Sequence, residues 1–183
     1  MDKKNTKDML LKLCVSGMFA ALICVATMLI QIPTPATHGY IHFGDCFILI
    51  AAWVLGPVYG FAAGGIGSAM ADLLSGYTHY VPGTFVIKGL IAVAAALIVH
   101  AFMRTNEKLR LPGYVVGGIT GEIIMVGGYY LYAATALGKG FVIALDSVLG
   151  NVVQGAFGVV VGVVLAQVIA KTHVLKKFGA YAV

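Results

Sequence analysis

The stretch that decides the fold is residues 45–74, DCFILIAAWVLGPVYGFAAGGIGSAMADLL, in which only Asp45 and Asp72 are charged. Apolar runs of this length are typical of helices that cross a lipid bilayer, whose hydrocarbon core is about 30 Å thick. The Gly56-Pro57 pair interrupts the run and is a turn signal. We therefore expect two short membrane helices, 45–55 and 58–74, joined by a tight turn. A single broken, re-entrant pair is the alternative.

The rest of the chain repeats this pattern. Hydrophobic residues make up 60% of the 183 residues and charged residues only 10%, which does not fit a soluble globular domain. Four further apolar blocks are expected to form helices, at residues 10–30, 84–103, 113–134 and 143–170. The sequence therefore predicts an all-α, polytopic membrane protein, a six-transmembrane-helix bundle that forms one membrane domain over residues 1–183.

The basic residues predict the orientation of this bundle. Ten of the twelve Lys and Arg lie before or in the first turn of the first helix, in the loop 104–112, or after the last helix. The positive-inside rule assigns these segments to the cytoplasm, so both termini are expected there. The basic residues flank apolar spans without interleaved aromatic residues, so we expect them to contact lipid headgroups rather than nucleic acid.

Ionisable residues inside a membrane are costly and usually mark function. Away from the cytoplasmic ends of the expected helices there are five, and all but Glu122 are near the outer ends: Asp45, Asp72, Lys88, Glu122 and Asp146. Histidine, tyrosine and amide side chains share this outer half, whereas the inner half consists largely of Ala, Val, Gly and Leu. The asymmetry predicts an outward-facing pocket for a small, flat, polar molecule that stacks on aromatic rings.

Structural interpretations of the same charges remain open. Asp72 and Lys88 are candidates for an ion pair between helices 58–74 and 84–103, because unpaired buried charges are expensive. Asp45 is a candidate N-cap. Glu122 has no basic neighbour in the sequence, so it is either a protonated structural carboxyl or a hydrogen-bond partner of the ligand.

The segment that contains His38, His42 and Asp45 has the residue types of a divalent metal site. It also contains prolines and lies in a loop, so a loop that closes over a ligand is favoured and no metal is expected. The sequence has no GxxxxGK[ST], HExxH or GxSxG motif, and these are the signatures of phosphate binding and of common hydrolases. We expect a protein that is not an enzyme and carries no cofactor of its own.

Residues 40–89 resemble the substrate-binding S components of energy-coupling factor (ECF) transporters. The resemblance rests on Gly44-Asp45, on LGPVYG at 55–60, on Ala71-Asp72-Leu73 and on Ile87-Lys88-Gly89. It looks closest to the branch that handles vitamin B6 and the hydroxymethylpyrimidine precursor of thiamin. It implies high-affinity uptake of a small aromatic vitamin or precursor across the plasma membrane of a bacterium. It also implies a transmembrane coupling subunit and two ATPase subunits as partners, with ATP bound on the ATPases.

The resemblance also implies which residues serve each role. The substrate-binding positions are His38, His42, Lys88, Glu122, Tyr129, Asn151 and Gln154. The positions that meet the coupling subunit are Ser16, Gly17, Ala20, Ala21 and Cys24, where cysteine departs from the usual small residue. Small residues spaced by four also permit close helix packing inside a bundle. A different vitamin (riboflavin, pantothenate or a corrinoid) is one alternative function, and a stand-alone secondary transporter or channel is another.

Overall fold

A computed structural model describes residues 3–29, 31–34 and 39–171. Its helices are α1 (Lys3–Leu29), α2 (Gly44–Leu74), α3 (Val81–Thr105), α4 (Arg110–Ala134), α5 (Phe141–Ala144) and α6 (Asp146–Lys171), and a short 3₁₀ turn, η1 (Glu107–Leu109), precedes α4. Within the described residues, five helical segments are long and apolar enough to cross a membrane: Thr6–Leu29, Gly44–Leu74, Val81–Thr105, Glu107–Ala134 and Phe141–Lys171. The all-helical membrane architecture is confirmed, whereas the count of six helices is not.

The difference in count arises in α2, which is one element with a break at Gly56. Gly56 has φ 80° and ψ −176°, a backbone conformation that is essentially restricted to glycine. A Cβ atom on Gly60 would lie 3.0 Å from Ala52 Cα, and one on Gly64 would lie 3.1 Å from Ile48 Cγ2. The two arms of α2 therefore fold back on each other. The first arm, residues 44–55, spans only about 18 Å at 1.5 Å per residue, too short to cross the bilayer alone.

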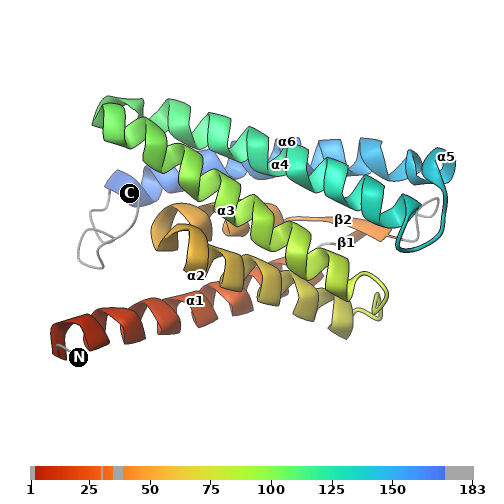
Figure 1. The fold of residues 1–183 in the computed structure, drawn as a ribbon, viewed down its shortest axis with the longest axis horizontal. Helices are drawn as coiled ribbons and strands as arrows, with labels where there is room; N and C mark the ends of the chain where they lie inside the picture. The colour runs from red at the N-terminus through yellow and green to blue at the C-terminus, as the bar shows by residue number, and fades with distance from the viewer. Residues whose placement is uncertain (1–2, 30, 35–38, 172–183) are drawn as a thin grey trace.

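The first arm of α2 forms the centre of the bundle. Ile48, Leu49 and Trp53 are completely buried, and the Trp53 ring lies 4.5 Å from the Tyr114 ring of α4, measured between centroids. Figure 1 shows α1 along one side of the bundle, α4 and α6 on the other, and α2 and α3 between them. Only 11% of the most apolar stretch of α1 is buried, against 67% for α2, so α1 is the most peripheral span.

The two ends of the bundle differ in character. The beginning of α1 and the end of α6 lie at the same end (Figure 1). Lys108 of η1 and Arg110 of α4 line a cleft there together with Lys171. The expected outer loop 31–44 instead contains two strands, β1 (Gln31–Thr34) and β2 (Gly39–His42), paired antiparallel with Gln31 opposite His42. Which end faces the cytoplasm stays a prediction that rests on the basic residues.

Candidate functional site

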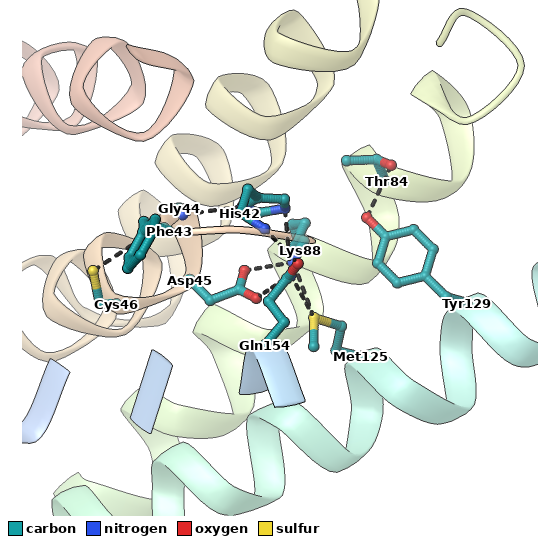
Figure 2. A network of polar contacts seen from close by, with 10 residues as sticks. All are labelled: His42, Phe43, Gly44, Asp45, Cys46, Thr84, Lys88, Met125, Tyr129 and Gln154. Carbon is teal, nitrogen blue, oxygen red and sulfur yellow. Dashed lines mark hydrogen bonds and ion pairs between the residues drawn. The ribbon is translucent and has the colours of Figure 1, made fainter. Parts of the chain in front are cut away.

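The candidate site is a buried polar network around Lys88 of α3. Lys88 is completely buried and pairs with Asp45, which lies in the first turn of α2 and is equally buried. Its Nζ also donates to Met125 Sδ on α4 at 3.0 Å, and it lies 5.6 Å from the centre of the Tyr129 ring. Figure 2 shows Lys88, Asp45 and Met125 pointing toward one another. One ammonium group therefore links α2, α3 and α4.

The observed partner of Lys88 differs from the predicted one. The ion pair is made with Asp45 and not with Asp72. The reason is the fold of α2, whose first arm turns back into the core and brings Asp45 to Lys88. Asp45 is also not an N-cap, because Phe43 holds that position and makes no side-chain capping bond.

Gln154 of α6 adds a further helix to the network. Its Nε2 donates to Asp45 Oδ2 at 2.6 Å, and its Oε1 accepts from the backbone N–H of His42 at 2.9 Å. These two bonds fix which end of the amide carries the oxygen. The Asp45 carboxylate is thus held by Lys88 on one oxygen and by Gln154 on the other, and the end of β2 is tied to α6.

His42 lies at the end of β2, outside the membrane-spanning segments. Burial, followed by the nearby positive charge of Lys88, lowers the pKa of His42 to about 3, and Asp45 opposes this change. The imidazole is therefore neutral near pH 7. Its Nδ1 accepts from the backbone N–H of Gly44 at 3.0 Å, and its Nε2 lies 3.3 Å from Gln154 Nε2.

Glu122 on α4 lies beside this network without joining it. The side chain is only 6% exposed, and neither carboxyl oxygen has a hydrogen-bond partner among the described residues. Two glycines of α6 make room for it. A Cβ on Gly155 would lie 2.9 Å from Glu122 Cβ, and a Cβ on Gly158 would lie 3.5 Å from Glu122 Oε1 and 3.0 Å from Asp45 Cβ. A buried carboxyl with no donor is costly, so a donor from outside the chain would be favourable here.

Aromatic side chains continue from the network toward the hairpin end of the bundle. Tyr129 bonds through its hydroxyl to Thr84 Oγ1 at 2.9 Å, and the Tyr80 ring lies 6.2 Å from both the Tyr129 and the Tyr132 ring. Lys139 donates to the Tyr80 hydroxyl at 3.1 Å. The predicted combination of aromatic rings with a few polar groups is therefore present around Lys88.

The comparisons with known proteins identify the family. The model of the "ECF-type riboflavin transporter, S component" family matches residues 7–171. This chain belongs to that family. The S component is a transport subunit of a multi-pass membrane transporter and not an enzyme, as the sequence predicted.

Individual relatives of this S component add detail. An uncharacterized protein of Pyrococcus woesei is 39% identical over 151 residues, covering 81% of this chain and 95% of the relative. The thiamine precursor transporter HmpT of Lactococcus lactis subsp. cremoris is 29% identical over 179 residues, covering 97% and 96%. A solved S component of a bacterial ECF transporter superposes with a TM-score of 0.65 at 20% identity, covering 88% of this chain and 96% of that one. That structure supports the fold alone.

The substrate-binding residues predicted for the S component fall into three groups. His42, Lys88 and Gln154 are joined in the network, and Tyr129 and Glu122 lie against it. Asn151 is half-buried one turn before Gln154, and no contact joins it to the network within the described residues. His38 lies outside the described residues. The sequence-based prediction did not include Asp45 among the substrate-binding residues. It also missed Met125, because an apolar stretch of sequence gives no signal for a polar contact.

The predicted docking positions on α1 of the S component differ in burial. Ser16 is buried and donates to the Tyr59 carbonyl at 3.1 Å, and Ala20 packs against Gly67, where a Cβ would lie 3.0 Å from Ala20 Cα. Both residues therefore pack inside the chain. Gly17 and Ala21 are exposed, and a Cβ on Gly17 would meet nothing within 4 Å. Cys24 is half-buried.

Proposed function

We propose that this S component binds an unphosphorylated aminopyrimidine of the hydroxymethylpyrimidine type at the network around Glu122. The observation that carries the proposal is the buried Glu122 carboxyl, whose two oxygens have no donor among the described residues. The similarity to a thiamine precursor transporter over nearly the whole chain supports the same substrate class.

The charge of the site favours an amine over an anion. Lys88 is already neutralised by Asp45, and Glu122 adds a second carboxyl group close to Asp45. A phosphate ester would therefore face two acidic groups and one basic group that is already paired. An exocyclic amine instead donates to a Glu122 oxygen, and a flat ring stacks on tyrosine.

Other vitamins fit these contacts less well. Pyridoxine, the vitamin B6 form of the sequence-based expectation, has a ring nitrogen and hydroxyl groups but no ring amine to donate to Glu122. Riboflavin, named in the description of the family, is a larger three-ring molecule. Both remain alternative substrates, and they belong in the binding panel.

Uptake is proposed to depend on partner subunits. Sequence motifs for ATP binding are lacking in this chain, so we assign ATP hydrolysis to two ATPases that act through a transmembrane coupling subunit. The exposed side of α1 at Gly17 and Ala21 is the proposed docking face, because small residues allow close helix contact in lipid. A stand-alone transporter would instead support uptake without the ATPases.

The substrate proposal is tested by calorimetric titration of the purified protein with hydroxymethylpyrimidine, pyridoxine and riboflavin. We expect one-to-one binding of the pyrimidine, about 10- to 100-fold weaker in Glu122→Gln, because a hydrogen bond to a charged group contributes about 1.5–3 kcal/mol. Asp146→Asn makes the same chemical change at an exposed position and should leave the affinity unchanged. Equal affinity of Glu122→Gln and the unmodified protein would exclude the assigned role.

A further inference from the structure

A polar cleft lies at the basic end of the bundle, and none of the residues of the network around Lys88 line it. It has a volume of about 300 Å³ and lies between η1, the beginning of α4 and the end of α6. Its polar lining consists of Glu107, Lys108, Arg110, Tyr114, Gln167 and Lys171. A volume at the lower end of the range for small-molecule sites suits a headgroup-sized ligand.

The charges of this cleft favour an anion. Lys108, Arg110 and Lys171 contribute three positive charges and Glu107 contributes one negative charge, which leaves an excess of two. Arg110 Nε is buried and has no hydrogen-bond partner among the described residues. A guanidinium group presents its N–H donors in a fork that matches two oxygens of a phosphate. A bound phosphate would therefore supply the partner that Arg110 Nε lacks.

The position of the cleft favours a lipid as the source of that phosphate. Leu111 and Ala170 complete its lining, and both lie in the terminal turns of helices that are apolar enough to cross a membrane. Leu111 is 45% exposed, so an apolar surface for the acyl chains adjoins the charged groups. We infer that this cleft binds the phosphate headgroup of an anionic lipid, in the manner of basic pockets between transmembrane helices.

The cleft is separate from the proposed docking face. Figure 1 shows α4 and α6 on the side of the bundle opposite α1, so a lipid held between them leaves the exposed residues of α1 accessible. The inference therefore does not depend on the identity of the vitamin or on the coupling subunit.

The test is native mass spectrometry of the full chain in detergent, titrated with phosphatidylglycerol or with phosphatidylcholine of the same acyl chains. We expect phosphatidylglycerol to bind more tightly. Its affinity should fall roughly fivefold in Lys171→Gln and again in Lys108→Gln, because each basic residue near the surface contributes about 1 kcal/mol. Both side chains are exposed, so folding should be unaffected. Arg110→Gln should lower the affinity for phosphatidylglycerol at least as much as either lysine variant.

Two further variants and one further ligand sharpen the result. Glu107→Gln removes the carboxylate from the cleft and should strengthen phosphatidylglycerol binding. Arg104→Gln removes one charge at the end of α3, outside the cleft lining, and should change nothing. Equal affinity for the two lipids, or an equal loss in Arg104→Gln, would overturn the inference. Inorganic phosphate that binds as tightly as the anionic lipid would overturn the lipid as the source.

Discussion

Lys88 and Asp45 form a completely buried ion pair that ties α3 to the beginning of α2. Gln154 holds the pair in place by donating to the second oxygen of Asp45. The position of both charged groups is therefore fixed. Because its two charges cancel, the chemical preference of the site is left to Glu122. We therefore assign a structural role to Asp45 and Lys88, separate from the recognition role proposed for Glu122.

Removing one partner of this pair should destabilise the protein strongly. Lys88→Met leaves Asp45 buried without its counter-charge, and breaking such pairs costs about 3–5 kcal/mol. The double variant Asp45→Asn/Lys88→Met removes both charges and should regain most of that loss. The measurement is the free energy of unfolding from denaturant titration in micelles. A single variant as stable as the unmodified protein would show that the pair is not formed.

The glycine face of α6 should be required for the position of Glu122. A Cβ on Gly155 would lie 2.9 Å from Glu122 Cβ, so Gly155→Ala must displace one of them. We expect weaker pyrimidine binding and a stability loss of about 1–3 kcal/mol, as for other overpacked cores. Gly127→Ala makes the same change on α4, where a Cβ meets nothing within 4 Å. If both variants bind the pyrimidine equally well, the glycine does not position Glu122.

The break in α2 should depend on Gly56. Alanine disfavours a φ of 80° combined with a ψ of −176°, and such strain costs about 1–3 kcal/mol. Gly56→Ala is therefore expected to lower the thermal midpoint, whereas Gly127→Ala in a regular helix should raise it slightly. A Gly56→Ala midpoint at or above that of the unmodified protein would contradict the folded-back geometry of α2.

The exposed side of α1 should control assembly and leave ligand binding intact. Gly17→Leu adds a bulky side chain where a close helix contact is proposed. Co-purification with the coupling subunit and ATPases should fall, while titration with the pyrimidine should give the unmodified affinity. Gly127→Leu places the same bulk on α4 and serves as the control. Normal assembly of Gly17→Leu would assign docking to a different face.

Much of the fold was predictable because its signals are local. Long apolar blocks predict the spans, and Gly56-Pro57 predicts the break between residues 45–55 and 58–74, which the structure places at Gly56. The strands at Gln31–Thr34 and Gly39–His42 were missed, because four-residue strands carry almost no alternating pattern and the first contains a proline.

The sequence indicated candidate residues for the site but not which of them contact each other. Charged and amide side chains are rare in membrane helices, so the sequence alone singled out Lys88, Glu122 and Gln154 as candidates, and His42 was singled out in the loop before Asp45. The partner of Lys88 was not, because helices adjacent in sequence suggested Asp72. Only the folding back of α2 brings Asp45 to Lys88, and that contact depends on tertiary geometry. The same holds for Ser16 and Ala20, whose small side chains pack against α2.

The most direct test of the substrate claim is mass spectrometry of the small molecules released when the purified protein is denatured. We expect hydroxymethylpyrimidine, or a close aminopyrimidine, from the unmodified protein and from Asp146→Asn, and a strongly reduced amount from Glu122→Gln. Release of riboflavin or a vitamin B6 form instead would contradict the proposed substrate. Equal amounts of pyrimidine from Glu122→Gln and the unmodified protein would contradict the proposed role of Glu122.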